Sequence, residues 1–167
     1  MGLIFADLNI EHSKIFTSWI ANKEVVKYSL SAFLPDRDKS WVRSFISSLN
    51  ENPATWDQAI VFDGVVIGYC GLTNISKLNR SGEYFIMIGD SNFWNRGLGT
   101  LAGKKVLEYG FGELGLHRIW LTVSELNYGG IKSYKNLGFV EEGRMKEACF
   151  RDGKFHDKVV MSMLASR

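Results

Sequence analysis

One stretch, residues 93–100 with the sequence Phe-Trp-Asn-Arg-Gly-Leu-Gly-Thr, constrains the fold of this chain more than any other. It follows the β-branched and aromatic run at 84–88. It precedes apolar side chains at helical spacing, which are Leu98, Leu101, Ala102, Val106 and Tyr109. The sequence therefore predicts a strand, a glycine-rich turn and a helix in direct succession.

The start of the predicted helix suits an anion. The first turn of a helix presents backbone N–H groups without intrahelical partners, and the helix dipole adds partial positive charge. Gly97 and Gly99 lack a Cβ and allow a bulky anion near the backbone, while Asn95, Arg96 and Thr100 can add side-chain donors. A pyrophosphate would fit such a site. Neither the P-loop nor the three-glycine dinucleotide fingerprint matches this stretch.

Composition limits the class of protein. A chain of 167 residues, with 46% apolar and 13% aromatic residues, suits one domain over 1–167 with a single core. The net charge of +2, without a basic run, does not indicate binding to nucleic acid or membranes. The start of the chain lacks a leader pattern, and no apolar run approaches the roughly 20 residues that span a bilayer, so we expect a cytoplasmic protein. Cys70 and Cys149 lack metal-like spacing, so we expect buried reduced thiols and no metal.

The remaining pattern predicts an α/β chain with a mixed sheet and helices on both faces. Asp63-Gly64 between two β-rich runs is a strong hairpin signal, and Gly115 and Gly138 end helices. The expected elements are a strand (3–9), a helix (12–22), an apolar loop (25–35), a helix capped by Asp36 or Asp38 that ends near 50–53, hairpin strands (58–62 and 65–72), a polar connection (74–82), a strand (83–88), the helix after the glycine turn, a strand (117–123), a helix (127–137), and two long strands (139–150 and 155–164) around a turn at 151–154.

The glycine turn, read as Trp94-Asn95-Arg96-Gly97-Leu98-Gly99, resembles the acyl-CoA signature [Gln/Arg]-x-x-Gly-x-[Gly/Ala] of the Gcn5-related N-acetyltransferases, the GNAT superfamily. Trp94 departs from the Gln or Arg of that pattern. Residues 116–119, the spacing from Asn127 to Tyr134, and residues 137–143 also resemble blocks of this superfamily. Residues 152–157 resemble the C-terminal hairpin of ribosomal-protein alanine and spermidine N-acetyltransferases. The resemblance implies the GNAT fold, with a mostly antiparallel sheet that splays at the cofactor site.

The resemblance also implies direct transfer of an acetyl group from acetyl-CoA to a primary amine in a ternary complex. It assigns the pyrophosphate to Asn95, Arg96, Gly97, Leu98, Gly99 and Thr100. In the family, the strand before the turn splays from its neighbour at a bulge, and the pantetheine arm pairs with it. Here that edge comprises Ile86, Met87 and Ile88, where a backbone N–H would donate to the thioester carbonyl oxygen.

Two residues are candidates for proton transfer. Tyr134 matches the tyrosine that protonates the departing thiolate in relatives, and a phenol has a reference pKa near 10. Glu83 matches a glutamate that accepts the amine proton, often through a water. Each has a structural alternative, since Tyr134 can pack on the sheet and Glu83 can end a strand in solvent. Asn127 is expected to cap the helix of Tyr134 and to bond the pantetheine arm. His117 and His156 rank below Glu83 as bases.

The acceptor amine is open at this point. A protein N-terminus, a polyamine, an amino sugar, an aminoglycoside or an amino-acid-like metabolite would each satisfy the motifs. In this fold the acceptor region corresponds to 28–37 and 150–156, and the lack of acids in 25–34 weakens a polyamine pocket. A non-catalytic acyl-CoA sensor of the same fold is the second class of function. A homodimer is compatible with the family.

Overall fold

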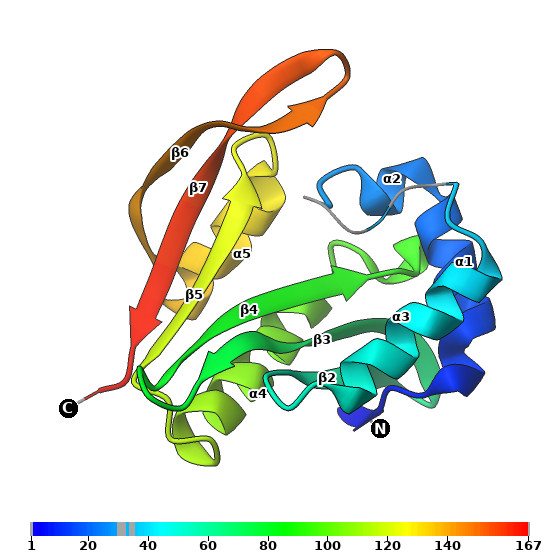
Figure 1. Cartoon of the computed structure of the whole chain (residues 1–167), viewed down its shortest axis with the longest axis horizontal. Helices are drawn as coiled ribbons and strands as arrows, with labels where there is room; N and C mark the ends of the chain where they lie inside the picture. The colour runs from blue at the N-terminus through cyan, green and yellow to red at the C-terminus, as the bar shows by residue number, and fades with distance from the viewer. Residues whose placement is uncertain (1, 30–32, 34–35, 167) are drawn as a thin grey trace.

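The computed structural model describes residues 2–29, 33 and 36–166. Its centre is a seven-stranded sheet in the order β1-β2-β3-β4-β5-β7-β6 (Figure 1). All neighbouring strands are antiparallel except β4 and β5, which are parallel, so the predicted mixed sheet is confirmed. The strands are β1 (Leu3–Asp7), β2 (Trp56–Phe62), β3 (Val65–Ser76), β4 (Ser81–Ile88), β5 (Arg118–Ser124), β6 (Val140–Arg151) and β7 (Lys154–Leu164).

Helices cover both faces of this sheet (Figure 1). One face carries α1 and α3, and the other carries α4 and α5. The helical elements are η1 (Ile10–His12), α1 (Ser13–Ala21), α2 (Lys23–Val26), α3 (Lys39–Glu51), η2 (Ser91–Phe93), α4 (Leu98–Gly112) and α5 (Tyr128–Leu137).

Each face has its own apolar cluster, and β4 contributes to both. Tyr84, Ile86 and Ile88 pack in the cluster beneath α4 and α5, whereas Phe85 and Met87 pack in the cluster beneath α1 and α3. Because side chains alternate along a strand, Glu83 lies on the α1/α3 face. The strand before the glycine turn therefore presents residues to both sides of the sheet.

Local signals in the sequence are confirmed by the backbone. The side chain of Asp38 caps α3 by accepting the N–H of Trp41 at 2.8 Å. Asp63 and Gly64 both have positive φ, 48° and 83°, as a two-residue hairpin turn requires. Gly138 closes α5 with φ 103°. Cys70 and Cys149 are buried free thiols, as expected.

Two expected connections are wrong. The sequence pattern predicts a polar connection over 74–82. In the structure, β3 continues to Ser76 and β4 begins at Ser81, so the connection is shorter than predicted. The strand continues because Ile75 packs against the core and its N–H donates to the carbonyl of Ala54 at 2.9 Å. The four-residue helix α2 overlaps the apolar loop expected at 25–35, and the Asn22 side chain caps it through the N–H of Glu24. Residues 30–32 and 34–35 of that loop lie outside the described residues.

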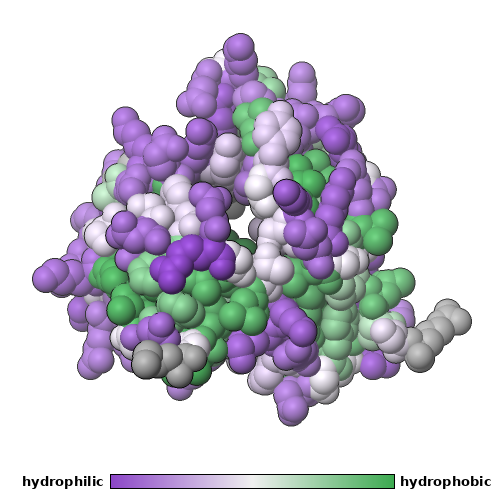
Figure 2. Space-filling view, turned by 180° about the vertical axis from the view of Figure 1, so that it is seen from behind, coloured by the Kyte–Doolittle hydropathy of each residue, from purple (hydrophilic) through white to green (hydrophobic). Residues whose placement is uncertain are grey.

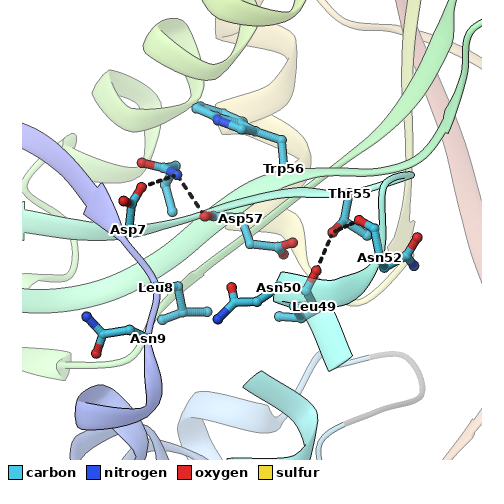
Figure 3. A pocket seen from close by; sticks show the side chains of 10 residues that line it. Asp7, Leu8, Asn9, Leu49, Asn50, Asn52, Thr55, Trp56 and Asp57 are labelled. Carbon is cyan, nitrogen blue, oxygen red and sulfur yellow. Dashed lines mark hydrogen bonds between the residues drawn. The ribbon is translucent and has the colours of Figure 1, made fainter. Parts of the chain in front are cut away.

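A polar cavity of about 380 Å³ lies between the end of α3 and the start of β2 (Figure 3). Among its lining residues are Asp7, Asn50 and Asp57, and none of the described lining residues is basic. The Asp57 Oδ1 atom is buried and has no hydrogen-bond partner among the described residues. Burial raises the pKa of this carboxyl to about 6, with a smaller opposing effect from the Thr55 hydroxyl. Because burial in this cavity already disfavours the charged form of the Asp57 carboxyl, and no described basic side chain lines it, the cavity does not suit a phosphate.

We predict that Asp57→Asn stabilises the protein at pH 7 by roughly 1 kcal/mol after allowance for solvent screening. The raised pKa means that the folded state binds more protons than the unfolded state between about pH 4 and pH 6. Wild-type stability should therefore fall as pH rises through this window, and the advantage of the variant should vanish towards pH 4. Urea unfolding at several pH values measures both, with Asp63→Asn at an exposed turn as the control. A variant less stable than wild type at pH 7 contradicts the prediction.

Candidate active site

The parallel ladder between β4 and β5 is short. It joins Ser81 to Arg118, Gly82 to Ile119 and Glu83 to Trp120, and no further pairs follow among the described residues. Beyond this point β4 remains paired with β3 and β5 remains paired with β7, so the two strands diverge (Figure 1). The space-filling view of the face with α4 and α5 shows a hollow near the middle of the molecule (Figure 2). The predicted splay of the sheet is confirmed, and Glu83 stands where it begins.

A bulge accompanies the splay, and it lies on β3. Thr73 pairs with Glu83 and Ser76 pairs with Ser81, which leaves Asn74 and Ile75 opposite a single residue of β4. Asn74 has φ 50°, in the left-handed region. Its side-chain Nδ2 donates to Glu83 Oε2 at 2.7 Å. The backbone irregularity and the candidate base are therefore in direct contact.

The edge of β4 that faces the gap presents the backbone groups of Ile86 and Ile88. The N–H of Gly89 donates to the carbonyl of Ile67 on β3 at 2.8 Å. Along an antiparallel strand, the backbone N–H and carbonyl groups of successive residues point alternately to the two neighbouring sides. Met87, two residues before Gly89 and paired with Tyr69, therefore also directs its backbone groups to β3, and Ile86 and Ile88 direct theirs to the gap. The Ile88 carbonyl accepts the indole N–H of Trp94 at 2.8 Å. Of the three expected edge residues, Ile86 and Ile88 are thus the two whose N–H groups point into the gap, where they have no partner strand among the described residues.

The glycine turn places free donors beside this edge. Asn95 and Gly97 both adopt left-handed backbone, with φ 58° and 73°, and Gly97 is the N-cap of α4. Leu101 is the first residue of α4 whose N–H donates to a preceding carbonyl, that of Gly97, at 3.0 Å. The earlier N–H groups of α4, on Leu98, Gly99 and Thr100, therefore have no intrahelical partner.

The start of α4 lies directly over the edge of β4. A Cβ on Gly99 would lie 4.0 Å from the side chains of both Ile86 and Ile88.

The expected side-chain donors of the turn differ in their surroundings. The guanidinium of Arg96 lies 5.3 Å and 5.1 Å from the ring centroids of Phe62 and Phe93, in cation–π contact. The Thr100 hydroxyl lies 2.8 Å from that of Ser133 on α5. Gly97 and Thr100 also line a groove of about 650 Å³ between α4 and α5, together with Lys104. Sequence reasoning missed Lys104 as a site residue, although it is seven positions after Gly97 and so two helical turns along the same face.

Asn127 and Tyr134 both belong to the α5 region, the first as the N-cap and the second within the helix. The Asn127 side chain caps α5 by accepting the N–H of Gly130 at 2.9 Å. The Tyr134 ring is half-buried and packs edge-to-face against Tyr84 and Phe139, at centroid distances of 6.0 Å and 6.1 Å. Burial raises the pKa of Tyr134 to about 12. The phenol is therefore protonated at every working pH, and it is a weaker acid than the reference value suggests.

The remaining candidate bases lie elsewhere. Glu83 is half-buried on the α1/α3 face, whereas Tyr134, on α5, packs in the apolar cluster of the other face, so the two residues lie on opposite faces of the sheet. His117 is exposed, and its backbone N–H donates to the carbonyl of Arg80 at 2.6 Å. The His156 ring faces Glu125, with 3.9 Å between Nδ1 and Oε1. Neither histidine contacts Glu83 among the described hydrogen bonds and ion pairs.

The two regions expected to bind the acceptor meet across the open end of the splay. The guanidinium of Arg151, at the tip of the β6–β7 hairpin, donates to the backbone carbonyl of Ser29, just after α2. The hairpin tip and the α2 segment lie above the diverging ends of β4 and β5 (Figure 1). This contact joins segments that are far apart in the sequence.

Comparison with known proteins agrees with this geometry. The family model described as "Acetyltransferase (GNAT) domain" matches residues 3–140. The chain belongs to this family. It is an acetyl-CoA-dependent N-acetyltransferase.

Both branches suggested by the sequence occur among the relatives of this acetyltransferase. The putative ribosomal N-acetyltransferase YdaF of Bacillus subtilis (strain 168) is 27% identical over 162 residues, covering 95% of this chain and 83% of that protein. The spermidine N(1)-acetyltransferase of Escherichia coli (strain K12) is 32% identical over 99 residues, covering 59% and 53%. The fold matches the spermidine N-acetyltransferase of Vibrio cholerae in complex with CoA and spermine, with a TM-score of 0.90, 24% identity, and coverage of 98% and 95%.

Two kinds of feature are absent from the part of the chain that the structure describes. No group of three or more His, Cys, Asp or Glu side chains gathers there in a way that could hold a metal ion. No helix within the same residues is long and apolar enough to cross a membrane.

We predict that Gly97→Glu abolishes stabilisation of the acetyltransferase by CoA. Wild type should gain roughly 2.7 kcal/mol at a ligand concentration a hundredfold above Kd, seen as a rise in Tm. The variant places a side chain and a negative charge at the free N–H groups of α4. Gly64→Glu is the matched control, because Gly64 also has positive φ, 83° against 73°, and also has open space around it. A normal CoA-induced shift in Gly97→Glu would place the cofactor elsewhere.

Proposed function

We propose that the protein transfers the acetyl group of acetyl-CoA to a primary amine in the gap between β4 and β5. One observation carries this proposal. The free N–H groups of α4 begin over the unpaired edge of β4, and Glu83 stands at the last rung before β4 and β5 diverge. Tyr134 packs against Tyr84, the next residue of the same strand, on the opposite face of the sheet from Glu83.

The cofactor would enter from the face with α4 and α5. Its pyrophosphate would bind the backbone of the 95–100 turn, and the groove beside Lys104 would hold an anionic or nucleotide part of the same molecule. The pantetheine arm would pair with Ile86 and Ile88 as an added strand, because their backbone groups lack a partner strand. The Asn127 amide group would be a further contact. Met87, whose side chain lies on the other face, would line the acceptor side.

The arrangement separates the two proton transfers. The amine nitrogen attacks the thioester carbon from the α1/α3 face, and its proton passes to Glu83 directly or through a water. A free N–H of β4 donates to the oxyanion of the tetrahedral intermediate. The carbon–sulfur bond then breaks towards the face with α4 and α5, where Tyr134 gives its proton to the sulfur. No covalent enzyme intermediate is required.

The raised pKa of Tyr134 affects the timing of this last step. A phenol with a pKa of about 12 does not protonate a thioester sulfur in advance, because the sulfur becomes basic only as its bond to carbon breaks. Proton transfer would therefore accompany departure of the thiolate. The same raised pKa keeps the Tyr134 phenol protonated across the neutral and alkaline range.

The acceptor is a protein N-terminus or a small-molecule amine under this proposal, with a polyamine or an amino sugar as the alternative. The name of one relative favours a ribosomal-protein substrate, and the names of others favour spermidine. Of residues 25–34, the structure describes 25–29 and 33. These residues include no acid that would bind a polyamine. Glu24 itself pairs with Lys27 at 3.7 Å. Cytoplasmic location and a homodimer stay predictions.

An amine panel tests the proposed reaction. The protein and acetyl-CoA are incubated with peptides bearing a free N-terminus, with polyamines, with amino sugars and with amino acids, and release of the CoA thiol is followed. We expect accelerated release with at least one class. CoA binding without accelerated release on any amine would instead indicate an acyl-CoA sensor.

Two substitutions test the assigned roles. Tyr134→Phe keeps the ring but removes the donor, so kcat should fall by about 10²- to 10⁴-fold while Tm and CoA affinity change little. Glu83→Gln should also slow turnover, but higher pH should partly restore it, because more of the acceptor amine is then neutral. Higher pH should not restore Tyr134→Phe. Near-normal kcat in Tyr134→Phe, when chemistry limits the rate, would leave that tyrosine a packing role only.

A further inference from the structure

Asn74 connects the irregularity of the sheet to the candidate base. It lies in the β3 bulge, directly beyond the Thr73–Glu83 pair, which is also the last rung before β4 and β5 diverge. Its Nδ2 donates to Glu83 Oε2 at 2.7 Å. This is a short hydrogen bond to a half-buried carboxylate, and bonds to charged acceptors are stronger than neutral ones.

The backbone determines where this side chain points. Asn74 has φ 50°, a region that Asn tolerates better than most residues but still at a cost in free energy. The next residue, Ile75, holds the bulge in place because its N–H donates to Ala54 at 2.9 Å and its side chain packs in the core. The amide is therefore aimed at Glu83 by a conformation anchored on both sides, and not by a flexible loop.

We propose that Asn74 is a positioning residue for Glu83, an inference that rests on the proposed role of Glu83 as the base. The Asn74 amide occupies Oε2 and leaves Oε1 to accept the proton of the amine. It also limits the rotation of a carboxylate that stands at the last rung of the ladder between β4 and β5. The β3 bulge thus lies where β4 and β5 begin to diverge, and its Asn74 side chain orients the Glu83 carboxylate at the same place.

The experiment separates positioning from a purely structural role. Asn74→Gly preserves the left-handed backbone but removes the amide, and Asn74→Asp keeps the shape but replaces the donor with an acceptor. Each should lower kcat about tenfold with a suitable amine, with unchanged KM for acetyl-CoA. Asp63→Gly, at a left-handed position of the β2–β3 turn, is the matched control and should keep wild-type kcat.

A double-mutant cycle decides the question. In the Glu83→Gln background, Asn74→Gly should cause no further loss, because the two residues act as one unit. The same tenfold loss in both backgrounds would show that Asn74 only supports the sheet and would overturn the proposal. If Asn74→Gly keeps normal kcat while Glu83→Gln is slow, the positioning role of Asn74 is overturned and the role of Glu83 as the base still stands. Normal kcat in Glu83→Gln would overturn the role of the base, and with it this inference.

Discussion

The structure depends on one constraint, which is that β4 and β5 pair only as far as Glu83 and Trp120. Each strand is held by its other neighbour, β4 by β3 and β5 by β7, so both strands remain paired on one side where they diverge from each other. Unpaired strand edges inside a protein leave backbone donors and acceptors without partners. A ligand that adds a strand would satisfy them, and this is the role that we propose for the pantetheine arm of the cofactor.

The closed end of the splay is held by charge and hydrogen bonds as well as by the ladder. Arg118, the first residue of β5, forms a bidentate pair with Glu142 of β6, with both N–O distances at 2.6 Å. The Ser162 hydroxyl of β7 donates to the same carboxylate at 2.6 Å. Hydrogen bonds from Arg118 and Ser162 lower the pKa of Glu142 to about 2, so the carboxylate is ionised at any working pH. Three strands are thereby tied together where the gap begins.

The period of two along a strand explains how one short segment supplies several functions. Consecutive residues of β4 face opposite sides of the sheet, so Glu83 lies on the α1/α3 face while Tyr84 packs against Tyr134 on the face with α4 and α5. Backbone groups alternate in the same way between β3 and the gap. Acetyl transfer adds an amine to the carbonyl carbon and then releases a thiolate from it, and a gap through a sheet gives access to that carbon from both faces.

The sequence by itself determined the local features of this protein. The glycine turn and its helix, the Asp63-Gly64 hairpin, and the caps at Asp38 and Asn127 all follow from residues that interact within a few positions of each other. The motif blocks also indicated the family and named Glu83 and Tyr134. Tertiary structure alone decided the bulge at Asn74, the position of Lys104 beside the groove, and the contact between Arg151 and Ser29. These depend on which strands pair, and in what register, between segments distant in the chain, and local propensity carries no information about that pairing.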